Sequence, residues 1–67
     1  MSSEAKLIVA PKSSPIACTL VDYSAGGACL QLFPMVALPD RLELLYGNIR
    51  KKCRIVWRRG NRIGVVF

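Results

Sequence analysis

Six short runs of strand-forming residues, each ended by turn residues, are the feature of this chain that most restricts its fold. The runs are rich in aliphatic and β-branched residues, and several alternate between apolar and polar positions, as half-buried strands do. The expected strands are Lys6–Ala10, Ile16–Val21, Ala28–Leu32, Arg41–Tyr46, Ile49–Arg58 and Arg62–Phe67. Strands this short, at turn spacings of about ten residues, predict an all-β fold, either an antiparallel barrel or a sandwich.

Proline, glycine and asparagine mark the connections between these strands. The expected turns are Pro11–Pro15, Asp22–Gly27, Gly47–Asn48 and Arg59–Asn61. Phe33–Asp40 contains two prolines and is too short for a helix, so we expect a crossing loop with buried apolar contacts. Met1–Ala5 is small and polar, which predicts a frayed end.

The length of 67 residues predicts one domain, residues 1–67. Its hydrophobic content of 52% separates it from disordered tails. The alternation within the strands assigns the core, and Trp57 shares the parity of Cys53 and Ile55 in its strand. The expected core includes Cys18, Leu30, Ile55, Trp57 and Val65.

Three cysteines, Cys18, Cys29 and Cys53, leave at least one thiol unpaired in a monomer. No signal peptide opens the chain and no stretch reaches the length of a membrane span, which predicts a cytoplasmic protein with reduced thiols and no membrane contact. We expect the cysteines to be small core residues without an essential function. A metal site is not expected, because the chain has neither histidine nor a C-x-x-C pair.

The formal net charge is +6, and most cations gather near the C-terminal end. They are Arg50, Lys51, Lys52, Arg54, Arg58, Arg59 and Arg62. Such a cluster is either a solvated strand face or an anion-binding surface for a nucleic acid, a nucleotide or an acidic protein. Composition alone leaves both interpretations open.

Catalysis is poorly supported by the available side chains. Histidine is absent, and the acids Glu4, Asp22, Asp40 and Glu43 form no spaced pair on one strand face. Asp22 and Ser24 lie two residues apart, but no third group completes a nucleophilic triad. We therefore expect a binding protein with no catalytic residues and no cofactor.

The turn Asp22–Gly27 reads D-Y-S-A-G-G and lies between two apolar runs. Aspartate and serine side chains hydrogen-bond to nearby backbone, and glycine permits unusual dihedral angles or close approach of another group. The segment is therefore either a plain β-turn or a turn that faces a ligand.

Two segments together resemble the PilZ domain family. The first is D-x-S-x-x-G at Asp22, Ser24 and Gly27, and the second is the ending C-R-I-V-W-R-R-G-N-R-I-G-V-V-F at Cys53–Phe67. The resemblance covers roughly Lys6–Phe67 and implies a six-stranded β-barrel of bacterial origin that binds cyclic di-GMP and passes the signal to a protein partner. It implies that Asp22 and Ser24 contact a guanine and that Gly27 lets the loop approach it.

The chain departs from the family at the second motif, R-x-x-x-R, which precedes the first strand and clamps phosphates and guanine edges. No arginine precedes Arg41, and Lys6 and Lys12 are the cations of that half. Either the sequence starts after the motif, or the chain is a divergent member. The first hypothesis is weak cyclic di-GMP binding through Asp22, Ser24 and Gly27.

Two further hypotheses remain. One is a PilZ-like module that acts through protein contacts without the dinucleotide. The other, a small basic barrel that binds nucleic acid, is disfavoured, because single-strand binders usually present several stacking aromatics. The strand aromatics here, Tyr46 and Trp57, are both expected to point inward.

Overall fold

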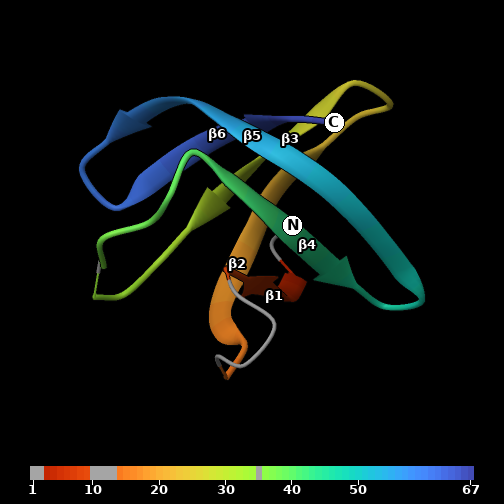
Figure 1. Ribbon diagram of the computed structural model, residues 1–67, viewed down its shortest axis with the longest axis horizontal. Coiled ribbons are helices and arrows are strands. Elements are labelled where there is room, and N and C mark those ends of the chain that lie inside the picture. Colours follow the sequence, from red (N-terminus) through yellow and green to blue (C-terminus); the bar gives the residue numbers. More distant parts are fainter. Residues whose placement is uncertain (1–2, 10–13, 35) are drawn as a thin grey trace.

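The computed structural model describes residues 3–9, 14–34 and 36–67, which form six strands and, within those ranges, no helix (Figure 1). The strands are β1 (Ser3–Ile8), β2 (Ile16–Tyr23), β3 (Gly27–Gln31), β4 (Arg41–Tyr46), β5 (Ile49–Arg59) and β6 (Arg62–Val66). All neighbours pair antiparallel in a closed barrel of order β1-β2-β3-β6-β5-β4. The structure confirms the expected all-β class and, of the two architectures, the barrel.

The strand bounds differ from the expected ones mainly at β1 and β2. The frayed end expected for Met1–Ala5 is wrong for Ser3–Ala5, which pairs with β2, while Met1 and Ser2 lie outside the described residues. Ala10, the expected end of the first strand, and most of the Pro11–Pro15 turn also lie outside them. Because β2 supplies pairing partners for Ser3, Glu4 and Ala5, strand pairing overrides the weak local strand preference of these residues.

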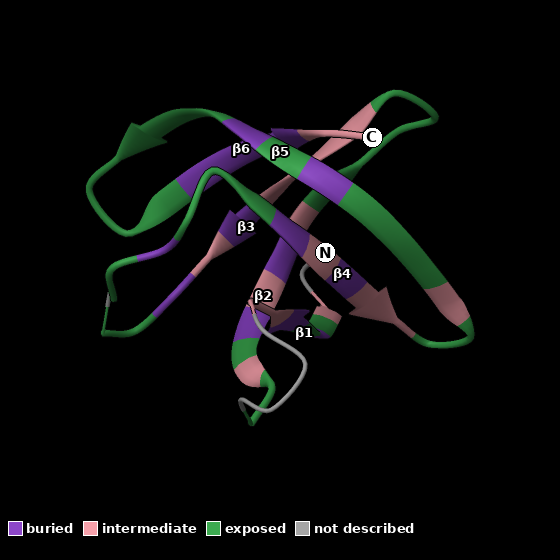
Figure 2. Cartoon of the chain, in the orientation of Figure 1, coloured by how far each residue is buried: buried purple, intermediate pink, exposed green. Residues whose placement is uncertain are grey.

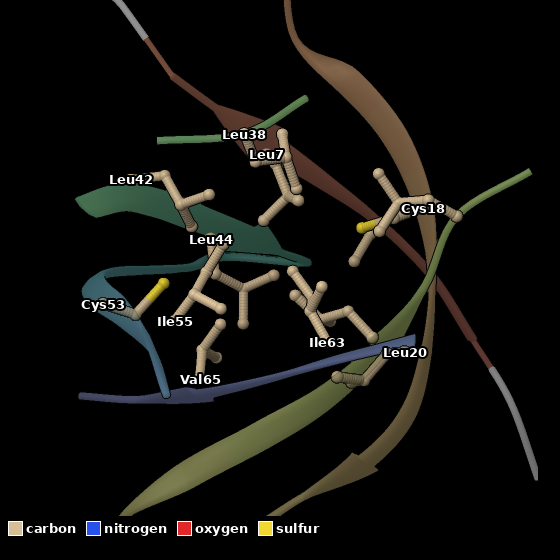
Figure 3. Close-up of a cluster of buried hydrophobic side chains, with 13 residues drawn as sticks. Leu7, Cys18, Leu20, Leu38, Leu42, Leu44, Cys53, Ile55, Ile63 and Val65 are labelled. Carbon is tan, nitrogen blue, oxygen red and sulfur yellow. The ribbon is translucent and has the colours of Figure 1, made fainter. Parts of the chain in front are cut away.

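Every strand contributes buried residues (Figure 2), and their side chains fill the interior of the barrel (Figure 3). Four of the expected core residues, Cys18, Leu30, Ile55 and Val65, are buried. Leu38, in the loop before β4, is buried with them, so it makes the apolar contact expected of Phe33–Asp40, whereas Phe33 and Val36 of the same segment are exposed.

The fifth expected core residue, Trp57, is not in the core, because 44% of it is exposed. The register of β5 against β6 shifts between Ile55 and Trp57, so that Ile55 lies opposite Val65 and Trp57 opposite Gly64. Val56 is the extra residue of this β-bulge. Since a bulge interrupts the alternation of side chains, Ile55 points inward and Trp57 points outward although they share a parity.

Two tight hairpins connect β4 to β5 and β5 to β6. Gly47 and Gly60 have φ angles of 58° and 56°, and each is followed by an asparagine without positive φ. A glycine with positive φ at the first central position alone is the signature of a type II′ turn, whose twist matches that of the flanking strands.

Aromatic rings close one end of the barrel. The ring of Tyr23 lies 6.1 Å from that of Tyr46 and 5.5 Å from that of Phe67, measured between centroids. The Lys51 ammonium lies 5.8 Å from the centre of the Phe67 ring. The distances suit tilted aromatic packing and a cation–π contact.

Candidate functional site

Asp22 lies in β2 and points away from the core, although the sequence places it in the following turn. The register of β2 against β3 shifts between Leu20 and Asp22, so Val21 forms a bulge. Leu20 is buried opposite Leu30, whereas Asp22 is exposed opposite Cys29. Without the bulge, Asp22 would share the inward face of Leu20, so the extra residue turns this carboxylate to the outside.

The Asp22 carboxylate is held by the backbone beside it. Its Oδ1 accepts a hydrogen bond from the Tyr23 N–H at 2.9 Å. The side chain is exposed, and this is its one hydrogen bond to the described part of the chain. Carboxylate oxygens accept several hydrogen bonds each, so the group retains capacity for a donor from outside the protein.

Ser24 and Gly27 close the turn between β2 and β3. The Ser24 N–H donates to the Gly27 carbonyl at 2.8 Å, and the Ser24 hydroxyl donates to the same oxygen at 3.2 Å. A Cβ atom on Gly27 would collide with the Val65 carbonyl oxygen, so glycine is needed here for the close approach of β6. These contacts account for Ser24 and Gly27 as turn residues whether or not a ligand binds.

The cross-strand register places Asp22 at one end of a row of outward-facing residues. Asp22 is opposite Cys29, Cys29 is opposite Gly64, and Gly64 is opposite Trp57. Residues directly opposite one another share a face, so the row crosses β2, β3, β6 and β5 on the outside of the barrel. Three strand spacings separate its ends, which is about 14 Å.

Trp57 covers Gly64 at the other end of this row. A Cβ atom on Gly64 would overlap the indole ring of Trp57, so the ring lies directly against the glycine backbone. Because 44% of the residue is exposed, part of the indole remains open to solvent. An aromatic surface supported from below is a platform on which a nucleobase can stack.

A second row on the same face carries positive charge. Thr19 is opposite Gln31, Gln31 is opposite Arg62, and Arg62 is opposite Arg59. Both arginines are exposed, and neither forms a salt bridge within the described residues. We call the two rows together, from β2 to the C-terminal half of β5, the Asp22 face.

The D-x-S-x-x-G motif identifies Asp22, Ser24 and Gly27, but no motif indicates that Trp57, Arg59 and Arg62 share the face of Asp22. One signal was available, because a glycine inside a strand, as at Gly64, often marks close approach of another group. The bulges left no comparable signal, since an extra residue looks like any other in an apolar run.

Two of the three thiols lie in the interior of the barrel. Cys18 and Cys53 are buried, and burial raises the pKa of each to about 11, so both are protonated at neutral pH. Cys29 is partly exposed and lies on the Asp22 face. In the described ranges, no three cysteine or acidic side chains are grouped to hold a metal ion.

The described part of the chain contains no helix of the length and apolarity needed to cross a membrane.

Comparison with known proteins agrees with the resemblance carried by the two motifs. Neither a curated protein nor a solved structure matches the chain. The family model for the PilZ domain matches residues 2–67, and it therefore spans both the D-x-S-x-x-G turn and the final hairpin. Together with the closed six-stranded barrel, this match shows that the chain belongs to the PilZ domain family.

Proposed function

We propose that this PilZ domain is a non-catalytic signalling module that binds cyclic di-GMP weakly on the Asp22 face and relays the signal to a partner protein. The observation that carries the proposal is the pair of bulges at Val21 and Val56. They turn Asp22 and Trp57 outward into one row across four strands. Bulges are frequent next to functional sites because they re-aim side chains.

Four side chains of the face, and the Ser24 hydroxyl in the turn that follows Asp22, each suit one part of the dinucleotide. The Asp22 carboxylate accepts hydrogen bonds from guanine N–H groups, and the Ser24 hydroxyl adds a short polar contact. The exposed part of the Trp57 indole offers stacking to a base. Arg59 and Arg62 supply guanidinium groups for a phosphate.

Weak affinity follows from the distribution of arginines. Residues 1–40 contain none, so no arginine from that half clamps the phosphates and guanine edges. A charge-assisted hydrogen bond contributes roughly 1.5–3 kcal/mol, and losing several costs orders of magnitude in affinity. Exposed cations are screened by salt, so the remaining affinity falls as ionic strength rises.

The test is a titration of the ¹⁵N-labelled domain with cyclic di-GMP, followed by amide NMR shifts at low and high salt. Shifts are expected in residues 19–31 and 57–64, and Asp22→Ala should remove them. Asp40→Ala is the matched control, because Asp40 is an exposed aspartate that is paired with Arg58 and belongs to neither row of the Asp22 face. Submicromolar binding that persists at high salt would show that other residues replace the arginines.

A module that acts through protein contacts alone is the second candidate. It is favoured by the local hydrogen bonds of Ser24 and Asp22, which explain the D-x-S-x-x-G turn without a ligand. No amide shift at millimolar cyclic di-GMP would decide for it.

Nucleic-acid binding needs its own control, because it was disfavoured on the expectation that Trp57 points inward. That expectation is wrong, and the indole is partly exposed. A random oligonucleotide added at low salt serves this purpose, since such binding depends steeply on salt. If the domain binds the oligonucleotide more tightly than cyclic di-GMP, nucleic-acid binding replaces cyclic di-GMP binding as the proposed function.

A further inference from the structure

A second surface of the barrel, which borders the Asp22 face along β6, is a shallow trough of about 900 Å³. It lies over β1, β4, the N-terminal half of β5 and the end of β6. Its cationic lining is Arg41, Arg50, Lys52 and Arg54, and Glu43 is its acidic residue. The trough thus gathers four of the cations that give the chain its net charge of +6.

The trough contains more positive charge than its own acid neutralises. The Arg50 Nε lies 2.7 Å from one Glu43 oxygen and its second nitrogen 3.2 Å from the other. The Arg50 hydrogen bonds lower the pKa of Glu43, which keeps this carboxylate ionised and paired. Arg41, Lys52 and Arg54 have no salt-bridge partner among residues 3–9, 14–34 and 36–67.

Arg41 and Arg54 are a like-charged pair that does not stabilise the folded barrel. They are directly opposite one another on β4 and β5, and both side chains are exposed in the trough. Like charges at directly opposite positions destabilise an antiparallel pair. Two adjacent guanidinium forks do, however, form a good receptor for carboxylates, which each fork binds through two parallel hydrogen bonds.

The remaining lining of the trough is mainly aliphatic. Ile8, Val9, Pro15 and Val66 contribute apolar surface beside the cations. The ring of Phe67 also lines it, but the Lys51 ammonium lies over that ring. Aliphatic walls accept aliphatic side chains, whereas nucleobases need an open aromatic face for stacking. A concave surface is also unsuited to a flat bilayer.

From these contacts we infer that the trough binds an acidic segment of a partner protein, with carboxylates on Arg41 and Arg54 and separate aliphatic side chains against Ile8 at one edge and Val66 at the other. The inference deepens the proposed function, since it rests on the domain acting through a partner. It does not depend on cyclic di-GMP, because the trough shares none of its cations with the Asp22 face.

The experiment uses a synthetic peptide of alternating glutamate and leucine residues, blocked at both ends, titrated into the ¹⁵N-labelled domain. Amide shifts are expected in residues 41–43 and 52–54. The double variant Arg41→Gln, Arg54→Gln should weaken binding of the peptide by about tenfold, since two exposed ion pairs, each worth a few-fold in affinity, together amount to that. The variant should fold at least as well as the parent, because it removes a like-charged pair.

The matched control is the double variant Arg59→Gln, Arg62→Gln. It removes the same charge from another cross-strand arginine pair, on the Asp22 face. This control variant should bind the peptide as the parent does and should lose its affinity for cyclic di-GMP. The Arg41→Gln, Arg54→Gln variant should lose affinity for the peptide and bind cyclic di-GMP as the parent does. The two proposals can therefore fail separately.

Three results would overturn the inference. One is equal weakening of the peptide by both double variants, which would show general charge attraction. Another is an equal affinity for a lysine–leucine peptide. The third is tighter binding of an oligonucleotide than of the acidic peptide at residues 41–54, which would assign the trough to nucleic acid.

Discussion

At residue 57 an indole ring lies against a glycine on the outside of the barrel, and about half of the residue is open to solvent. Truncation of a fully buried tryptophan to alanine costs about 3–5 kcal/mol. Because Trp57 is only partly buried, Trp57→Ala should cost roughly half of that, about 2 kcal/mol. Urea denaturation followed by far-UV circular dichroism gives the free energy of unfolding without relying on the removed fluorophore.

Leu30→Ala is the control for this prediction, because Leu30 is fully buried at 0% exposure. It should cost more than Trp57→Ala, within the range of about 2–5 kcal/mol seen for buried leucines. A Trp57→Ala domain that is unfolded, or that loses as much stability as Leu30→Ala, would contradict the outward position of the indole.

Adjacent glycines in the β2–β3 turn provide a second prediction at the scale of single residues. A Cβ atom on Gly26 has no atom within 4 Å, whereas one on Gly27 collides with the Val65 carbonyl. Gly26→Ala should therefore change the free energy of unfolding by less than about 0.5 kcal/mol. Gly27→Ala should destabilise by about 1–3 kcal/mol, because β6 must move. Equal urea midpoints for the two variants would refute this difference.

At the scale of strands, alternation and turn residues in the sequence predicted six strands and their approximate bounds along the chain. It failed where pairing adds or shifts a residue. Val21 and Val56 are ordinary members of apolar runs, yet each forms a bulge that reverses the faces of the residues after it. The orientation of Asp22 and Trp57 therefore depends on strand register, which no local pattern encodes.

The β5–β6 hairpin gives a prediction at this scale. Gly60 has a φ of 56°, which costs an L-residue about 1–2 kcal/mol because its Cβ meets the following carbonyl. Gly60→Ala should destabilise the domain by about 1 kcal/mol, and Gly60→Asn by less, since asparagine tolerates positive φ. The midpoints of thermal unfolding rank the parent and the two variants by stability. Equal destabilisation by alanine and asparagine would argue against strain in the turn as the cause.

At the scale of the whole molecule, barrel closure decides which charges act together. The sequence shows seven cations between residues 50 and 62, and closure places five of them on two surfaces. Arg50, Lys52 and Arg54 line the trough, whereas Arg59 and Arg62 lie on the Asp22 face. β5 pairs with β4 from Ile49 to Arg54 and with β6 from Arg54 to Arg59. Its first half thus contributes to the trough beside Arg41, and its second half contributes to the Asp22 face. The order of residues along the chain does not separate these groups, because Ile8 of β1 joins the trough from the other end of the sequence.

Closure also encloses two thiols in one interior, and this gives the barrel a stability that depends on pH. Burial raises the pKa of Cys18 and of Cys53 to about 11, whereas an unfolded thiol ionises near about 8.5. Above that lower value the unfolded chain releases protons that the folded barrel retains. The free energy of unfolding should therefore be unaffected by these thiols below about pH 8.5 and should fall between about pH 8.5 and 11.

Urea midpoints at pH 8 and pH 10.5 measure this decrease in the free energy of unfolding. Cysteine variants separate the contribution of the thiols from that of lysine and tyrosine side chains, which also titrate in this range. The double variant Cys18→Ala, Cys53→Ala should remain folded, because no role beyond packing is expected of either residue. It should lose less stability than the parent over this interval. Cys29→Ala is the matched control and should keep the parental fall, since Cys29 is only partly buried and lies outside the core. A double variant whose midpoint falls as steeply as that of the parent would show that groups other than the interior thiols cause the pH dependence.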